Sequence, residues 1–352
     1  MAPRRSKPVE IVETDRLEGF PHPRETTRLI GQDVVLTRAA RAIRSGKPPG
    51  AWLISGPPGI GKATLAYRIL RYLLAYGATD KGPADLSVPE KDPVAMQVAA
   101  ASHPGMLVLK RGLNDSGKLM TVLSVAEIRK LGGFFGMSSG AGGWRVAIVD
   151  TADDMNDAAA NGLLKLLEEP PNRAMLLLLS NTPGRLLPTI RSRCQRLELR
   201  PLEPELLARE LSQLLPELNV EERSALARLS GGSIGAALQL AGGDGLELAR
   251  EADLLLENAA SPDVPGLLAL ADKLARITDG LESFGAFLIE AIAARIRAKA
   301  VKGAPNLDRW IETLNRLGNS FGRTGALHLE PRQTVLNASR EISKVTRRAG
   351  SI

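Results

Sequence analysis

The sequence feature that most constrains the fold is the stretch GPPGIGKA at residues 56–63, which follows the apolar run at residues 51–54. A short buried strand, a glycine-rich turn and the start of a helix form a P-loop, whose consensus is G-x-x-x-x-G-K followed by Ser or Thr. Glycines let backbone N–H groups surround a phosphate, and the helix N-terminus adds partial positive charge. The sequence therefore predicts a phosphate-shaped loop at the end of a strand.

The loop departs from the consensus at its last position. Lys62 stands where a lysine reaches the terminal phosphates of a nucleotide. Ala63 replaces the hydroxyl that ligates Mg²⁺, and Thr64 is turned by about 100° around the helix axis because an α-helix has ~3.6 residues per turn. We therefore expect a loop that accepts a phosphate and holds a metal poorly.

A second informative stretch is WRVAIVDTADD, in which Asp150 follows four apolar residues. An acid at the carboxyl end of a buried parallel strand is typical of a Walker B strand, whose Asp holds Mg²⁺. In ATPases of this layout the next residue is a Glu that orients the attacking water, and here it is Thr151. A hydroxyl does not act as that base, and general-base catalysis contributes ~10²- to 10⁴-fold. We interpret Asp153 and Asp154 as helix N-terminal acids, although their carboxylates offer an alternative base.

These observations predict a degenerate nucleotide site. The residues that we assign to it are Gly56, Gly59, Gly61, Lys62, Thr64 and Asp150. The apolar strand at residues 174–179 ends in Ser180, Asn181 and Thr182, which either sense a terminal phosphate or cap the following turn.

Four apolar strands alternate with helices in the first 200 residues and predict an α/β fold with a parallel, doubly wound sheet. Residues 76–93 read as an irregular surface insertion, and everything beyond residue 199 reads as helical. We expect four parts. They are a flexible N-terminal tail (1–20), a P-loop-like module (21–200), a small helical lid (201–245) and an all-α domain (246–352).

Composition excludes several classes of protein. No apolar run approaches the ~18 to 20 residues of a membrane span, and the basic N-terminus lacks the apolar stretch of a secretory signal. The only cysteine, Cys194, excludes an internal disulfide, and with three widely spaced histidines it gives no metal-ligand spacing. We therefore expect a cytoplasmic protein without a metal site.

The positive charge is concentrated near the C-terminus. The chain carries a net charge of +7, whereas residues 295–352 hold 12 Lys and Arg against 4 Asp and Glu, or +8. Because aromatic residues do not alternate with these charges, we interpret them as solvated helix faces. A nucleic-acid-binding module is the alternative, and it predicts DNA binding with a steep salt dependence.

The motifs GPPGIGKA, VAIVDTADD, AAANGLLKLLEEPP and TIRSRC, in this order, resemble those of clamp-loader subunits of the AAA+ family, and above all the delta-prime type of bacterial DNA polymerase III. The most specific signals are the helix NGLLKLLEEPP and the triplet Ser192, Arg193 and Cys194. HPG at residues 103–105 and GQ at residues 31–32 also match. The resemblance covers residues 20 to 240, and the remainder matches only by length and helical character.

The resemblance implies an AAA+ module with a lid, and a collar domain through which five subunits form an open ring. The expected partners are the gamma/tau and delta subunits, with the beta sliding clamp and primed DNA contacted by the assembled complex during replication. A delta-prime subunit is regarded as a stator that does not hydrolyse ATP, and the polymerase activity resides in other subunits of the holoenzyme. Arg193 then is an arginine finger for the neighbouring ATP site, worth ~10³- to 10⁵-fold in rate. The alternative for Arg193 is a salt bridge that closes its own module.

Departures from active relatives favour this interpretation. Ala63, Thr151 and Gly235, the last standing where the motif GSxRxAL has a sensor arginine, each remove a group from this chain's own nucleotide site. The four-cysteine zinc module of many relatives is missing, and we expect residues 76–93 in its place. We expect no certain cofactor, no zinc, and at most weak ATP binding without hydrolysis. The rival interpretation is an active AAA+ ATPase, either a gamma/tau-type motor subunit or a DNA-repair ATPase.

Overall fold

The computed structural model describes residues 16–17, 19–112, 120, 122–136, 143–277, 280–301, 307–327 and 330–349. Most of the predicted N-terminal tail lies outside the described residues. The chain divides into two compact units. The first ends at Glu203 and also includes Ser233–Gly235, and the second comprises Pro204–Gly232 and the residues from Ala236 onward.

Within the described residues, the first unit contains a five-stranded sheet in the order β2-β3-β4-β1-β5, and every strand pair is parallel. The predicted α/β fold with a parallel sheet is confirmed. The central strand β4 is buried at all seven positions, which explains its continuous apolar run. The strands are β1 (Ala51–Ser55), β2 (Met106–Leu109), β3 (Arg145–Val149), β4 (Ala174–Ser180) and β5 (Gln195–Glu198).

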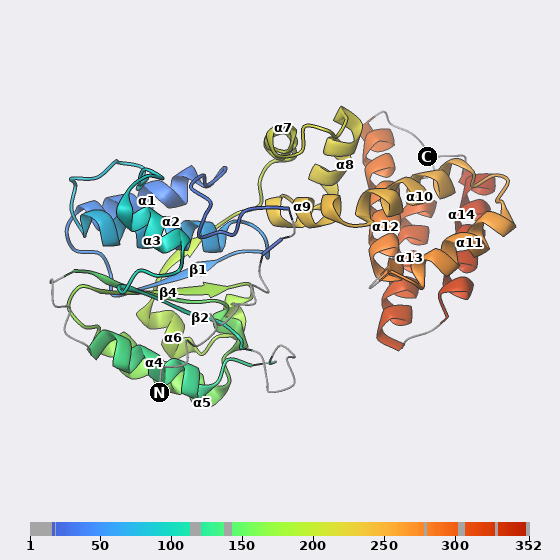
Figure 1. Ribbon diagram of the computed structural model, residues 1–352. Coiled ribbons are helices and arrows are strands. Elements are labelled where there is room, and N and C mark those ends of the chain that lie inside the picture. Colours follow the sequence, from blue (N-terminus) through green and yellow to red (C-terminus); the bar gives the residue numbers. More distant parts are fainter. Residues whose placement is uncertain are drawn as a thin grey trace, which may run out of the picture. The chain divides into compact units, whose positions relative to one another are not determined.

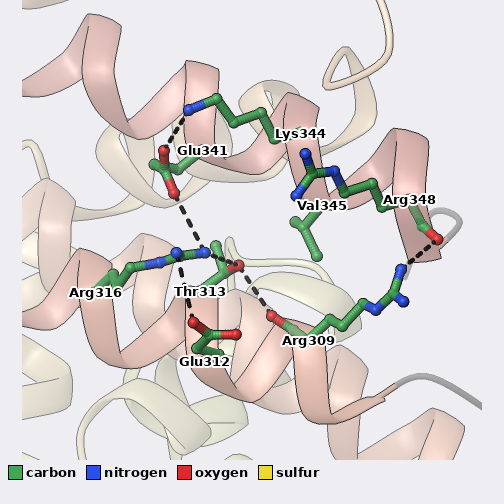
Figure 2. A pocket seen from close by; sticks show the side chains of 8 residues that line it. All are labelled: Arg309, Glu312, Thr313, Arg316, Glu341, Lys344, Val345 and Arg348. Carbon is green, nitrogen blue, oxygen red and sulfur yellow. Dashed lines mark hydrogen bonds and ion pairs between the residues drawn. The ribbon is translucent and has the colours of Figure 1, made fainter.

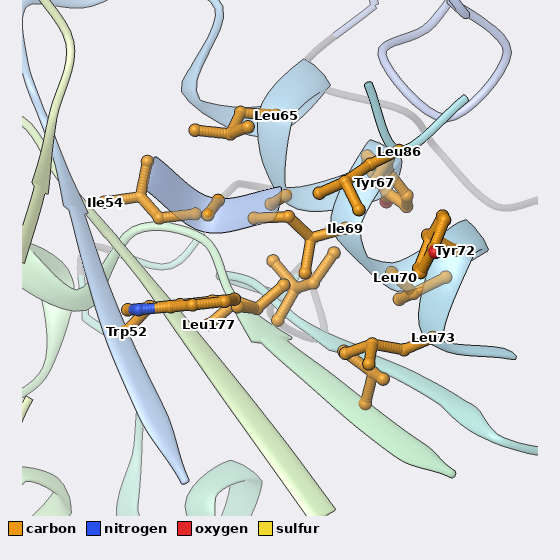
Figure 3. Packing of buried hydrophobic residues seen from close by; sticks show 14 of the residues in the cluster. Trp52, Ile54, Leu65, Tyr67, Ile69, Leu70, Tyr72, Leu73, Leu86 and Leu177 are labelled. Carbon is orange, nitrogen blue, oxygen red and sulfur yellow. The ribbon is translucent and has the colours of Figure 1, made fainter. Parts of the chain in front are cut away.

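Helices cover both faces of this sheet (Figure 1). On β1, Trp52 and Ile54 face one core, whereas Leu53 faces the other, because successive side chains of a strand point to opposite faces. In the first core, Trp52 packs beside Leu177 of β4 and Ile69 of α2 (Figure 3). The helices on the first face are α1 (Asp33–Arg44), α2 (Lys62–Tyr76) and α3 (Pro93–Ala99), and those on the second are α4 (Val125–Gly136), α5 (Asp157–Glu168) and α6 (Pro188–Arg193).

Two elements of this unit were not predicted. β5 buries only Leu197, so it lacks the apolar run that marked the other strands. α3 follows the insertion and begins with Asp92 as N-cap, whose carboxylate accepts from the N–H of Val94 at 2.8 Å. The insertion itself is irregular as predicted, yet it packs closely, since Leu86 is fully buried.

All regular elements in the described part of the second unit are helices. As the apolar spacing predicted, Phe284, Leu288 and Ile292 of α12 are fully buried in one core. None of the described helices is long and apolar enough to cross a membrane. The helices after β5 are α7 (Pro204–Leu214), α8 (Val220–Leu229), α9 (Ile234–Gly242), α10 (Gly245–Glu257), α11 (Val264–Leu274), α12 (Gly280–Val301), α13 (Leu307–Leu327) and α14 (Pro331–Ala349).

Candidate functional site

The topology of the sheet brings the predicted nucleotide-site residues to one edge. β4 lies between β1 and β3, and all three run parallel. The P-loop follows β1, Asp150 follows β3, and residues 180–182 close β4. The carboxyl ends of adjacent parallel strands meet at the same edge, which is where ligands of such sheets bind.

Lys62 is turned toward its own loop. Its ammonium donates to the carbonyls of Gly56 at 2.8 Å and Pro57 at 2.7 Å, and the side chain is buried. The pKa of Lys62 is lowered to about 8 because burial disfavours the charge more than the nearby Asp150 and Asp153 favour it. The preceding Gly61 has φ +103°, a left-handed conformation that suits glycine at the start of α2.

Thr151 and Asp154, which follow the predicted metal ligand Asp150, are engaged in contacts of their own. The hydroxyl of Thr151 donates to the carboxylate of Asp154 at 2.9 Å, and Arg111 pairs with the same carboxylate at 3.0 Å. Thr64 and Ala63 are both partly buried in the first turn of α2. Thr151 is therefore part of a local network with Asp154, and this carboxylate already has two partners.

Asp153 has a role that sequence reasoning missed. Its carboxylate accepts from the hydroxyl of Ser180 at 2.7 Å, and from the backbone N–H groups of Asn181 and Thr182, so it joins the ends of β3 and β4. We had interpreted it as a helix N-terminal acid, and it does lie in the 3₁₀ turn Ala152–Asp154. No local pattern announces this role, because the partners are 27 to 29 residues away.

The tip of the P-loop is held by the distant segment Ser233–Gly235, which belongs to the same unit. The hydroxyl of Ser233 donates to the carbonyl of Pro58 at 2.9 Å, and the N–H of Gly235 donates to the carbonyl of Gly59 at 2.9 Å. A Cβ at position 235 would lie 2.7 Å from the Cα of Gly59. The position of the expected sensor arginine thus accepts no side chain unless the P-loop moves.

Arg193 lies at the opposite edge of the sheet, where the strands begin, because α6 leads into the amino end of β5. Its guanidinium pairs with the carboxylate of Glu168 at 2.8 Å and donates to the carbonyl of Thr189 at 3.1 Å. The Arg193 side chain is 36% exposed. The structure therefore brings Lys62 and Asp150 toward each other and leaves Arg193 apart from them.

The other two residues of the triplet support this arginine. Cys194 is buried in the core beneath α6, and burial raises the pKa of its thiol to about 12. The hydroxyl of Ser192 donates to the carbonyl of Thr189 at 3.1 Å. Cys194 is therefore an inert anchor beside an exposed guanidinium. Among the described residues, no group of three or more His, Cys, Asp or Glu gathers in a way that would hold a metal.

Comparison with known proteins finds relatives of the first unit. Residues 31–203 match the family model described as DNA polymerase III, delta subunit. The chain is 37% identical to the delta-prime subunit of DNA polymerase III from Pseudomonas aeruginosa over 184 residues, which are 52% of this chain and 53% of that protein. It is 36% identical to the delta-prime subunit of Escherichia coli K12 over 203 residues, 57% of each chain.

More distant matches are gamma/tau subunits of the same polymerase. The subunit from Mycobacterium bovis is 27% identical over 277 residues, which are 75% of this chain and 43% of that protein. This chain spans about half the length of the first two relatives. The resemblance to delta-prime subunits is thus confirmed, and it rests on the match of residues 31–203 to the DNA polymerase III delta-subunit model and on the two delta-prime relatives.

Proposed function

We propose that this chain is a delta-prime-type subunit of a bacterial clamp loader, which helps to load the beta sliding clamp onto primed DNA without hydrolysing ATP itself. Its partners are the gamma/tau and delta subunits, and it works with the replisome. Within this proposal, residues 201–245 act as a lid and residues 246–352 as the collar domain that joins the subunits.

The observation that carries the proposal is the contrast between two edges of one sheet. At the P-loop edge, Ala63 and Thr151 lack the groups that ligate Mg²⁺ and orient water, and Gly235 leaves no room for a sensor arginine. At the other edge, Arg193 is intact and partly exposed. A site that has lost its own catalytic groups while keeping an outward-facing arginine is suited to serve a neighbouring site.

The contacts of Arg193 favour donation in trans over a closing salt bridge. Both Arg193 and its partner Glu168 are exposed, at 36% and 51% of their side chains. Exposed ion pairs contribute only ~0.2 to 1 kcal/mol, so the phosphate of a neighbouring nucleotide competes readily for the guanidinium. The pair therefore adds little to closing the module.

Reconstitution tests this role. Arg193→Ala is expected to leave the chain folded and able to assemble with gamma/tau and delta subunits, while lowering the DNA-stimulated ATP hydrolysis of the complex. Arg185→Ala, which removes an exposed arginine after β4, is the matched control and should leave turnover unchanged. Equal turnover with Arg193→Ala and with the native chain would contradict the proposed arginine finger.

The rival function is an active AAA+ ATPase of the gamma/tau or DNA-repair type. Lys62, Asp150 and the P-loop glycines are retained, and gamma/tau subunits are among the relatives. ATP turnover by the purified chain separates the two. Turnover well above background that disappears in Lys62→Ala would favour the rival, whereas background rates for both proteins are expected here.

A further inference from the structure

A cleft of about 660 Å³ lies between α13 and α14, within the second unit. Figure 2 shows its charged walls, with Arg309, Glu312 and Arg316 on α13 and Glu341, Lys344 and Arg348 on α14. The floor is formed in part by Thr313 and Val345, which are buried. The cleft therefore combines a closed base with a rim of long, exposed charged side chains.

Part of the charge in the cleft is balanced by ion pairs. Glu341 pairs with Lys344 at 2.9 Å and with Arg316 at 3.3 Å, and Arg316 also reaches Glu312 at 3.6 Å. Two carboxylates are thus matched by two cations within this group.

Two arginines are left over. Arg309 donates through Nη1 to the carbonyl of Arg348 at 3.1 Å, and within the described part of the chain neither guanidinium pairs with a carboxylate. Both side chains belong to exposed residues on the cleft wall. The cleft consequently carries an excess of two positive charges, both from guanidinium groups.

The excess charge continues along α14. Arg340, Lys344 and Arg348 follow one another at intervals of four residues, so they share one helix face, and all three are exposed. Guanidinium groups match the oxygens of phosphate with paired N–H donors. A line of cations that leads into a guanidinium-walled cleft matches a ligand with repeated negative charges.

The described walls of the cleft lack aromatic side chains, and this indicates which part of a nucleic acid the cleft would contact. Trp310 and Phe321, the aromatic residues of α13, are buried in the core of the unit, and no aromatic side chain lines the cleft within the described residues. Proteins that bind single strands stack the bases on aromatic side chains, whereas a positively charged groove follows the backbone phosphates. The cleft is built for a backbone and not for bases.

We propose that the cleft between α13 and α14 binds the backbone phosphates of a single nucleic-acid strand, without reading its sequence. This site is separate from the sheet edges that carry the proposed clamp-loader role. It gives the basic C-terminal region a specific contact, and it takes up the nucleic-acid-binding alternative in place of the solvated helix face that we favoured from the sequence.

The test measures binding of the full-length chain to a fluorescein-labelled 20-nucleotide oligo-dT by fluorescence anisotropy, over a range of salt concentrations. Arg348→Gln is expected to weaken binding at least fivefold at low salt. It should also reduce the slope of log K against log salt by about 0.7, the value for one phosphate contact on a single strand. Arg347→Gln is the matched control, because Arg347 is an exposed neighbour on the same turn that does not line the cleft.

A second variant guards against a folding artefact. Glu312→Gln removes a wall carboxylate that is 70% exposed, and it should tighten binding two- to threefold, a gain that misfolding does not produce. Equal losses in Arg348→Gln and Arg347→Gln would mean diffuse charge attraction and overturn the proposal. So would unchanged binding in Glu312→Gln, or displacement of oligo-dT by poly-glutamate of equal charge at equal concentration.

Discussion

The carboxylate of Glu168 lies 2.8 Å from the guanidinium of Arg193, so the end of α5 is joined to the end of α6. The two residues come from the two most specific motifs of the sequence, NGLLKLLEEPP and the Ser-Arg-Cys triplet. Glu168 holds Arg193 in a defined position at the sheet edge away from the P-loop. Glu168 is therefore the partner within the chain that the proposed arginine finger has to leave before it reaches a neighbouring nucleotide.

Glu168→Gln tests whether the ion pair with Glu168 competes with the proposed use of Arg193 by a neighbouring site. Because the pair is exposed, we expect the variant to lose less than about 1 kcal/mol of unfolding free energy in a urea titration. In a reconstituted complex, its ATP turnover should equal or exceed that of the native complex, since Arg193 is released and intact. Turnover as low as that of Arg193→Ala would instead mean that Glu168 has to hold Arg193 in place for catalysis.

Gly235 gives a prediction about packing against the P-loop. Gly235→Ala places a Cβ 2.7 Å from the Cα of Gly59, so the loop or α9 must shift. Such overpacking costs typically ~1 to 3 kcal/mol, which a urea titration would detect. Gly242→Ala on the same helix is the control, because nothing lies within 4 Å of its added Cβ. Equal stability of the two variants would show that the P-loop yields without cost.

The sequence predicted those features that depend on local patterns. The P-loop, the strand before Asp150 and the helix that contains Leu163 were recognised because apolar runs, glycines and helical spacing lie within a few residues of each other. β5 was missed because an edge strand with one buried residue has no apolar run. Propensity and periodicity therefore predicted the framework of the fold but not the edge strand β5.

Contacts between distant segments could not be predicted from local sequence patterns. Asp153 meets residues 180–182, and Ser233 meets Pro58 from 175 positions away. Such hydrogen bonds produce no periodic pattern in the sequence, because each needs only one polar group at either end. The candidate site was therefore predicted as a set of residues, whereas the network that fixes the ends of β3 and β4 came only with the structure.

Lys62 predicts a pH dependence of stability. Its pKa is lowered from 10.5 to about 8 on folding, so between these values the unfolded chain binds more protons and stability rises with pH. Below pH 8 both states are charged and the cost of burying the ammonium is fully present. Lys62→Met should therefore raise the unfolding free energy at pH 7.5, by on the order of 1 to 3 kcal/mol.

Urea titrations of both proteins at pH 7.5 and pH 10 check this sign. The advantage of Lys62→Met should shrink at pH 10, because the native lysine is then largely neutral in the folded state. Lys47→Met, at an exposed lysine in the turn before β1, is the control and should show no such change. A lower stability of Lys62→Met at pH 7.5 would mean that the bonds to the loop carbonyls outweigh desolvation.

The burial of Cys194 predicts that its thiol is unreactive in the folded chain. Burial raises its pKa to about 12, and the thiolate is the reactive form, so at pH 8 native protein should react with iodoacetamide far more slowly than a free cysteine does. The same protein in 8 M urea should take up one label per chain, because the sequence contains a single cysteine. Mass spectrometry of timed samples measures both rates.

Rapid labelling under native conditions would place Cys194 at the surface and remove the anchor beneath Arg193. Labelling at the rate of global unfolding would instead mean that the triplet opens only with the whole unit, as a residue buried among Leu186 and Ile190 requires.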